Sequence, residues 1–304
     1  MKNISVVIPC YNSAKTIINC LISIGKSCEI ILIDDFSCDD TVKVIEDFKM
    51  NNPEYDIKLI CNVKNCGAGN SRNLGIKNVT GKYILFVDSD DELVPNCIDI
   101  LNDYTAVSDY DCIIFDAQIL KNNKSHKLKM FYSNKINEGI IKQNEALVYT
   151  RGCTCGKLYK ADVIKKFNVR FGTTRINEDL VFTKTALMFA CKIYYINKCL
   201  YIYKQMNNSL MHKERMNVND NNEISAYKRI KEMASGQYSE EMNSIYFLEV
   251  LYARISRLIL VGYGRKMCKN AYDELAKNYK KPDKYFKKYL FKYKLAYLFI
   301  KLYC

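Results

Sequence analysis

The sequence predicts an α/β fold in which a mainly parallel, doubly wound sheet is flanked by helices. Over about the first 90 residues, short apolar runs rich in β-branched residues alternate with segments of helical periodicity. The runs are apolar at nearly every position, which is typical of strands buried on both faces. Strands that alternate with helices require crossover connections, and such connections produce parallel pairing. With 304 residues, of which 49% are hydrophobic, the chain can bury a large core.

Each element of the first half follows from a local pattern. Residues 4–8 form a β-branched run that Pro9 ends, and Asn12 or Ser13 can cap the helix that follows. Residues 37–40 can begin a second helix in the same way. The other elements predicted here are strands at 29–33, 56–60 and 82–87 and a helix at 71–78. Because ligands of such sheets bind at the carboxyl ends of the strands, we expect a site among the polar clusters found there.

The pattern is looser beyond residue 101. It predicts a strand at 111–115, a basic polar loop at 121–129, a helix at 143–149, a helix from 176–179 to 189, a strand at 192–203 and helices from about 213. We therefore expect one domain over 1–212, with halves at 1–104 and 105–212, followed by a basic helical C-terminal region at 213–304.

Charge is divided unevenly along the chain. Residues 1–104 contain 10 Lys and Arg against 15 Asp and Glu, whereas residues 105–304 contain 36 against 18. An acidic first part is suited to hold a metal ion, and a basic remainder is suited to meet an anionic partner. The simpler alternative is a solvated lysine-rich surface. No nucleic-acid-binding module is recognisable, so nucleic acid is not an expected partner.

The cysteine pattern and the lengths of the apolar runs indicate in which cellular compartment the protein is found. The 14 cysteines include no CxxC pair, the chain has only two histidines, and no secretory signal precedes the first strand. No apolar run reaches the ~18 residues that span a bilayer. We therefore expect reduced thiols, no zinc site and a cytoplasmic protein.

The strongest local motif is Asp88-Ser89-Asp90, which directly follows the predicted strand at 82–87. Two carboxylates one residue apart at a strand end can face a hard divalent cation, and Mg²⁺ or Mn²⁺ bound in this way keeps coordination positions open for phosphate oxygens. As an isolated tripeptide the motif is equally compatible with a cluster at a helix N-terminus.

Four motifs in order give this tripeptide a context. They are Val6-Val7-Ile8-Pro9-Cys10-Tyr11-Asn12, then Ile33-Asp34-Asp35-Phe36-Ser37, then Asn65-Cys66-Gly67 with Ser71-Arg72-Asn73-Leu74-Gly75, and then Phe86-Val87-Asp88-Ser89-Asp90-Asp91. Together they resemble the family 2 glycosyltransferases, which are inverting enzymes with a GT-A fold that use nucleotide sugars. The resemblance continues in Gly156-Lys157-Leu158-Tyr159, Asn177-Glu178-Asp179-Leu180-Val181-Phe182 and Leu200-Tyr201-Ile202-Tyr203 with Ser209, and covers about residues 3–212.

This resemblance implies a donor site and a cofactor. Asp90 would hold Mn²⁺ or Mg²⁺, with Asp88 on the ribose or the water shell of the metal. Asp35, in preference to Asp34, would accept a hydrogen bond from a pyrimidine N–H. The implied donor-binding residues are Pro9, Tyr11, Asp34, Asp35, Asn65, Arg72, Asp88 and Ser89. A UDP-sugar is the donor that the resemblance favours, and residues 1–104 would be the nucleotide-sugar half.

The resemblance also implies the acceptor side at residues 105–212. Asp179 would be the general base for the acceptor hydroxyl, Glu178 would assist it, and His212 is a candidate third metal ligand. Each has a plain structural alternative, since carboxylates stabilise a helix N-terminus and histidines are common on surfaces. The implied acceptor is a glycan or lipid-linked hydroxyl in bacterial surface polysaccharide, lipopolysaccharide or capsule synthesis.

The lysine-rich end of the chain has three interpretations. Lys287, Lys288, Lys292 and Lys294 fall within about half of a helical wheel, and each lysine near an anionic leaflet contributes about 1 kcal/mol. The region could thus hold the enzyme peripherally on the inner face of the cytoplasmic membrane. Alternatively, the same helix packs on the body through its aliphatic residues, or it binds nucleic acid, which we disfavour.

Other classes of protein compete with the transferase interpretation. Gly67-Ala68-Gly69 follows a strand, but Arg72 stands where a dinucleotide-binding loop has its third glycine. A non-catalytic, membrane-associated subunit of the same fold is opposed by the intact acidic residues. A sugar nucleotidyltransferase is opposed by the lack of a glycine-rich, arginine-containing loop after the first strand. Phe36, where the family commonly has a small residue, leaves the nucleotide open.

Overall fold

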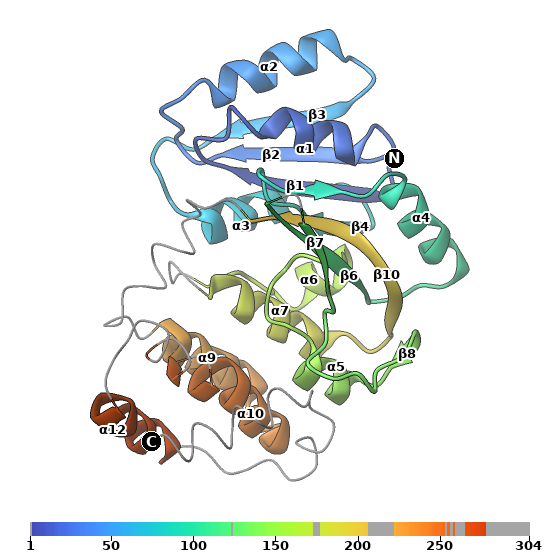
Figure 1. Ribbon diagram of the computed structural model, residues 1–304. Helices are drawn as coiled ribbons and strands as arrows, with labels where there is room; N and C mark the ends of the chain where they lie inside the picture. The colour runs from blue at the N-terminus through green and yellow to red at the C-terminus, as the bar shows by residue number, and fades with distance from the viewer. Residues whose placement is uncertain are drawn as a thin grey trace.

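In the described part of the chain, the computed structural model has a sheet of ten strands at its centre, and the first four strands pair in parallel in the order β3-β2-β1-β4 (Figure 1). Helices α1 and α2 cover one face of these strands and α3 covers the other, as right-handed crossovers require. The parallel arrangement predicted for the first half is therefore confirmed. The elements are β1 (Ile4–Cys10), α1 (Ile17–Ile24), β2 (Glu29–Asp34), α2 (Thr41–Asn51), β3 (Asp56–Cys61), α3 (Ala68–Asn78) and β4 (Tyr83–Phe86).

The sheet becomes mixed beyond β4. Strand β9 pairs antiparallel with both β4 and β6, β6 pairs parallel with β10, and β5, β7 and β8 add antiparallel edges. The elements are β5 (Glu92–Leu93), α4 (Cys97–Val107), β6 (Cys112–Lys121), β7 (Lys124–Leu128), β8 (Gly139–Ile141), α5 (Gln143–Tyr149), β9 (Lys157–Lys160), α6 (Ala161–Lys166), α7 (Glu178–Phe189) and β10 (Ile193–Lys204).

The structure describes residues 2–122, 124–172, 177–205, 222–252, 254–255, 258 and 265–277. His212, Ser209 and the lysines at 287, 288, 292 and 294 lie outside these residues, as does Ile176 at the start of the predicted helix. Within the described residues, no helix combines the length and apolarity needed to cross a membrane. The domain boundaries remain a prediction.

Strand β1 continues two residues beyond the predicted end, through Pro9 to Cys10. Proline is tolerated in this central strand because β4 pairs with β1 only as far as Val7, so Pro9 lies past the end of that ladder. Helix α3 packs tightly against β1: a Cβ on Gly75 would lie 2.3 Å from Val7 Cγ1. The central strand is therefore fixed by close packing up to the edge where the polar residues begin.

Two local predictions were wrong. Neither Asn12 nor Ser13 caps α1, which begins at Ile17. In the turn before the helix, the carbonyl of Ser13 accepts hydrogen bonds from the backbone N–H groups of Thr16 and Ile17. Both side chains instead bond to other loops. The predicted loop at 121–129 is largely strand β7, because its main chain pairs with β6 from Leu128 to Lys124 although its side chains are polar. Period and polarity alone cannot detect such an edge strand.

The described helices of the C-terminal region lie at the end of the molecule opposite α2 (Figure 1). They contact the rest through α7 and α5, and Lys184 of α7 is fully buried. Its ammonium donates to the carbonyls of Leu147 and Thr150 at 2.9 and 2.6 Å and lies 3.9 Å from Glu249 Oε1. Burial lowers the pKa of Lys184 to about 8. The elements are α9 (Asn222–Ala234), α10 (Ser239–Ile245), the π-helix η1 (Tyr246–Tyr252) and α12 (Arg265–Ala276).

Candidate active site

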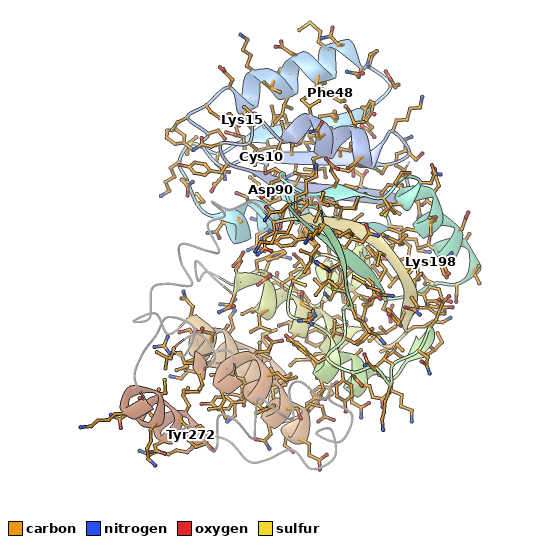
Figure 2. All side chains as sticks on the ribbon, viewed as in Figure 1. Cys10, Lys15, Phe48, Asp90, Lys198 and Tyr272 are labelled. Atoms are coloured by element: carbon orange, nitrogen blue, oxygen red, sulfur yellow. The ribbon has the colours of Figure 1, made fainter. Side chains whose placement is uncertain are left out.

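The polar residues predicted at the strand ends gather at one edge of the sheet, where β1, β2 and β4 end and α7 begins. Figure 2 shows Asp90 close to Cys10, the last residue of β1. Parallel pairing of β2 and β4 on either side of β1 brings the ends of these strands to the same edge. The structure thus brings together residues that are far apart in the sequence.

Asp35, at the end of β2, organises the loop that precedes α3. Its Oδ1 accepts hydrogen bonds from Cys66 N and Asn62 Nδ2, both at 2.8 Å, and its Oδ2 accepts one from Gly67 N at 2.7 Å. The Asn65 amide donates to the carbonyl of Asp35 at 3.3 Å. Asp35 is only 3% exposed, and one further lone pair on Oδ2 can accept a donor from a ligand.

Asp34 has a different task from its neighbour. Its carboxylate accepts hydrogen bonds from Ser37 N at 3.0 Å and from Ser37 Oγ at 2.5 Å. These bonds close a tight turn in which Phe36 takes a left-handed conformation, with φ of 66°. Asp34 is therefore committed to the turn, which agrees with the preference for Asp35 as the residue that faces a base.

The loop after β1 lies beside the Asp88 motif. Ser13 Oγ and Ser89 Oγ form a buried hydrogen bond of 2.7 Å, which joins the two loops. Pro9 is buried within β1, whereas the Tyr11 ring is 44% exposed at the rim of the site. Of these predicted residues, Tyr11 is thus the one whose ring is free to contact a ligand, and Pro9 and Ser89 shape the wall.

Arg72 of α3 joins the two acidic motifs. Its side chain is 7% exposed, with NH2 2.5 Å from Asp88 Oδ1 and NH1 3.1 Å from Glu178 Oε1. Burial opposes its charge, but Asp88 and Glu178 outweigh that effect and raise the pKa of Arg72. The guanidinium therefore stays charged and holds the end of β4 against the start of α7.

A cluster of aromatic side chains packs against the guanidinium of Arg72. The guanidinium carbon lies 5.3 Å from the centroid of the Phe171 ring, which stacks on Phe182 at 4.2 Å and meets Phe86 edge-on at 5.1 Å. Asn73 of α3 accepts a hydrogen bond from Phe171 N at 2.9 Å. The cation–π contact with Phe171, whose ring packs on α7 and whose backbone is bound by α3, fixes the position of Arg72.

Gly69 explains how α3 and α7 can approach so closely. A Cβ at this position would lie 2.9 Å from Glu178 Cγ and 3.0 Å from the carbonyl oxygen of Gly172. The glycines that suggested a dinucleotide loop therefore have other reasons: Gly67 has φ of 85°, and Gly69 makes room for the carboxylate of Glu178.

The carboxylates after β4 crowd one another. Burial, followed by the charge of Asp88, raises the pKa of Asp90 to about 6. Burial and the charges of Asp88 and Asp90 raise the pKa of Asp91 to about 8, although Asp91 accepts hydrogen bonds from Tyr201 OH at 2.6 Å and Lys204 N at 2.9 Å. This end of the sheet therefore carries negative charge that the protein only partly neutralises.

Asp179 lies in the first turn of α7, next to Glu178. Its Oδ1 accepts a hydrogen bond from Leu180 N at 2.8 Å. Burial, Glu178 and Cys153 raise the pKa of Asp179 well above its usual range, and burial does the same, more weakly, for Glu178. Each carboxylate thus binds a proton more readily than an exposed one, which is a property of general bases.

Asp88 and Asp90 can supply some, but not all, of the ligands of a divalent cation. Among the described residues, no three His, Cys, Asp or Glu side chains are arranged to hold a metal by themselves. Burial and the neighbouring charge of Asp88 nevertheless raise the pKa of Asp90, and a cation beside Asp90 would favour its ionised form. Asp90 and Asp88 would hold a Mg²⁺ or Mn²⁺ whose other positions are filled by water and phosphate, as is usual for these ions.

Three functional contacts were not predicted from the sequence. Tyr201 OH accepts a hydrogen bond from Asp88 N at 3.2 Å in addition to donating to Asp91, so it fixes the loop of residues 88–91. The ring of Phe171 packs against the guanidinium of Arg72, and the Asn62 amide donates a hydrogen bond to Asp35. For Tyr201 a signal existed, since the motif at 200–203 was noted for its resemblance; the other two have no local pattern.

The mixed sheet and the acidic edge define a protein of the GT-A type, a fold that binds nucleotide sugars at the carboxyl ends of its first strands. A family model described as Glycosyl transferase family 2 matches residues 5–167. The chain belongs to this family, as the order of its motifs predicted.

Relatives and solved structures agree with this assignment. Glycosyltransferase GlyA of Streptococcus pneumoniae is 28% identical over 68% of this chain and 31% of its own length. The Staphylococcus aureus enzyme TarS, a poly(ribitol-phosphate) beta-N-acetylglucosaminyltransferase, is 27% identical over 67% of this chain and 35% of its own length. The chain thus spans about a third of these two relatives.

Two solved structures show the same fold. That of S. aureus TarS residues 1–349 with UDP-GlcNAc has a TM-score of 0.61 at 20% identity, and the alignment covers 99% of this chain and 79% of TarS 1–349. The mannosyltransferase PcManGT of Pyrobaculum calidifontis, in complex with GDP-Man and Mn²⁺, has a TM-score of 0.59 at 14% identity, with 99% and 87% covered. The α/β fold with a central sheet and flanking helices is therefore confirmed.

Proposed function

We propose that this protein transfers one sugar, with inversion, from a UDP-sugar to a hydroxyl of a glycan or glycolipid acceptor in bacterial surface polysaccharide synthesis. The observation that carries the proposal is the meeting of two acidic motifs across Arg72, with Asp88 on one side and Glu178 on the other. One motif suits a nucleotide diphosphate with a cation and the other suits a general base. The UDP-GlcNAc complex of TarS supports the choice of donor class.

The donor half supplies recognition of the nucleotide. The open lone pair of Asp35 Oδ2 suits the N–H of a uracil, and the exposed ring of Tyr11 suits contact with the face of the base. The Ser13–Ser89 bond holds the two loops that flank the ribose at a fixed separation. These side chains would therefore orient the base and the ribose of the donor.

The leaving group determines the need for a cofactor. A nucleoside diphosphate is multiply anionic, and the ionised carboxylates of Asp88 and Asp90 would repel it. Asp90 and Asp88 would hold a divalent cation, which would supply positive charge to the diphosphate as a Lewis acid. The Mn²⁺ complex of PcManGT supports this cofactor class.

The acceptor half supplies the base. Asp179, with its raised pKa, takes the proton of the acceptor hydroxyl as oxygen attacks the anomeric carbon opposite the leaving group. Arg72 holds Glu178, and thereby the first turn of α7, in a fixed position relative to Asp88. The base and the leaving-group site therefore keep their separation throughout the reaction.

The first experiment is thermal unfolding of the full chain with UDP, GDP, CDP or ADP, each with and without Mn²⁺. At 100 times its dissociation constant a ligand of the native state adds about 2.7 kcal/mol, which is readily visible as a rise in Tm. We expect the largest rise with UDP together with Mn²⁺. The absence of a rise with every nucleotide would instead favour a non-catalytic subunit of the same fold.

Replacing the base separates chemistry from binding. We expect Asp179→Asn to lower kcat by roughly 10²–10⁴-fold, which is the usual contribution of general-base catalysis, with UDP binding and Tm retained. The measurement is steady-state transfer beside a UDP titration. Asp103→Asn, on the exposed face of α4, is the matched control. Full activity of folded Asp179→Asn would remove this residue from the mechanism.

The place of the reaction is also part of the proposal. A lipid-linked acceptor would bring the enzyme to the inner face of the cytoplasmic membrane, and the lysines at 287, 288, 292 and 294 would assist through anionic lipid. Flotation of the full chain with vesicles of anionic and of neutral lipid tests this. Equal recovery with both lipids would exclude an electrostatic anchor.

A further inference from the structure

A pocket of about 270 Å³ lies between α7 and α9, beside the proposed base. We call it the α7–α9 pocket; it is lined by Gly172, Val181, Ser225, Ala226, Lys228, Arg229 and Glu232. Val181 follows Asp179 by two residues, about 3 Å along the helix axis. Gly172 N donates to the carbonyl of Glu178 at 3.2 Å, so the pocket opens where the acidic turn of α7 begins. It is smaller than a site for a drug-sized molecule.

The α9 wall of the pocket is one face of that helix. Ser225, Lys228, Arg229 and Glu232 recur at spacings of three and four residues, which places them side by side. The opposite face, with Tyr227 and Ile230, is buried in the core. All four wall residues are exposed, so the polar wall is presented to solvent while the apolar face anchors the helix.

The charge of this wall contrasts with that of the acidic edge. Lys228 and Arg229 outnumber Glu232, and within the part of the chain that the structure describes neither cation has a carboxylate at ion-pair distance. Their positive charge is therefore available to a ligand. A serine hydroxyl at Ser225 adds a donor to the same wall.

We propose that the α7–α9 pocket binds a phosphate group carried by the acceptor, next to the hydroxyl that is glycosylated. The proposal rests on the transferase function proposed above, and it names the class of acceptor. A neutral glycan would gain nothing from two unpaired cations, whereas a phosphate would be drawn to Lys228 and Arg229 and repelled by the carboxylates around Asp179. This difference positions the acceptor with its hydroxyl toward Asp179.

Two sources of such a phosphate are chemically possible. One is a phosphodiester within an anionic polyol polymer, and the other is the diphosphate of a prenyl-linked sugar. The name of the relative TarS includes poly(ribitol-phosphate), which makes the first a useful probe. The two sources share the recognition chemistry and differ in what lies beyond the phosphate.

The test uses two double variants of the full chain that lose the same charge. Lys228→Gln with Arg229→Gln removes the cations of the pocket, and Lys231→Gln with Lys266→Gln removes two exposed lysines outside it. Exposed substitutions of this kind leave stability within about 0.5 kcal/mol. The acceptors are a synthetic ribitol-phosphate tetramer, the same tetramer as its neutral methyl phosphotriester, and a farnesyl-diphosphate-linked N-acetylglucosamine.

We expect the pocket variant to raise the acceptor KM about tenfold with a phosphate-bearing acceptor, with kcat and the donor KM within about twofold. The control variant should change the KM less than about twofold, and the triester should bind the wild-type protein as weakly as the tetramer binds the pocket variant. The acceptor that shows the effect identifies the source of the phosphate. Equal KM values for both variants with both charged acceptors would overturn the proposal.

Calorimetric titration of the tetramer into the protein without donor keeps this test independent of turnover. If no sugar is transferred to any acceptor but the tetramer binds through Lys228 and Arg229, the transferase function fails and the phosphate site stands. If transfer proceeds and binding ignores both cations, the phosphate site fails and the transferase function stands.

Discussion

The ends of β2 and β4 both carry acidic residues, yet the two ends use them in opposite ways. After β2, Asp34 and Asp35 accept hydrogen bonds from Ser37, Cys66, Gly67 and Asn62, so their charge is spent on building loops. After β4, burial and mutual repulsion raise the pKa of the neighbouring carboxyls. The comparison teaches that the carboxylates after β2 are held in place by hydrogen-bond donors, with one lone pair of Asp35 left for a ligand, whereas those after β4 are crowded by burial and by one another's charge.

The largest expected effect comes from the β4 end. Asp90→Asn should reduce transfer about a thousandfold, as loss of a principal electrostatic contact does, while Tm stays equal or rises because a crowded charge is removed. Transfer assays and thermal unfolding at pH 7.5 measure the two quantities. A clear drop in Tm would mean that Asp90 is structural and would break the contrast between the two ends.

At the β2 end we expect the reverse. Asp35→Asn presents an amide to the N–H groups of Cys66 and Gly67, and so should lower the free energy of unfolding by about 2–4 kcal/mol. Denaturant unfolding measures the change. The control is Asp40→Asn, an exposed aspartate before α2 whose side chain makes no capping bond. A variant as stable as the wild type would show that the three donors are satisfied elsewhere.

The pH dependence of stability sharpens the comparison further. The folded-state pKa of Asp91 is raised to about 8, so the folded state binds a proton at this carboxyl more tightly than the unfolded state does. This proton binding stabilises the fold in full below the usual pKa near 4, and the stabilisation is lost as pH rises through 8. Asp91→Asn should therefore gain about 1–3 kcal/mol relative to wild type between pH 5 and pH 8.5. Denaturant titrations at both pH values test this, and parallel pH profiles for the two proteins would contradict it.

The smallest expected effect lies in the turn that Asp34 closes. Phe36 has φ of 66° and is 52% exposed, so its side chain adds strain with little burial to offset it. Phe36→Asn should stabilise the fold by about 0.5–1 kcal/mol, since asparagine tolerates this conformation. Val63→Asn, at a fully exposed site without positive φ, controls for the loss of apolar surface. A lower UDP affinity without stabilisation would instead assign Phe36 to the base pocket.

Much of the fold could be predicted because its signals are local. The runs at 4–8 and 29–33 are apolar throughout, and their burial on both faces follows directly. The edge strand β7 could not be predicted, since its exposed lysines and His126 carry no alternating pattern and its pairing depends on β6. The start of α1 was also missed, because Asn12 and Ser13 bond across loops instead of along the chain.

For the candidate site, the residue types were predictable but their division of labour was not. The order of the motifs gave Asp35, Arg72, Asp88 and Asp179 before any coordinates. Distinguishing the roles of Asp34 and Asp90 required the surroundings of each carboxylate: Asp34 accepts hydrogen bonds from Ser37, three residues on, whereas burial and the charge of Asp88 raise the pKa of Asp90. Gly69 is the clearest case, since its role lies in the space that Glu178 occupies more than a hundred residues later.

The buried ammonium of Lys184 indicates how far the chain can be shortened from its C-terminal end before the fold loses stability. Its carbonyl partners come from α5, but its counter-charge, Glu249, lies in η1 and is also bound by Tyr132 OH at 3.1 Å. A fragment limited to the family-matched residues 5–167 would lack α7 altogether, and one that ended at residue 212 would lose both the helix α9 that packs on α7 and the carboxylate of Glu249 beside Lys184. We therefore expect the smallest stable fragment of this chain to include the helices up to η1.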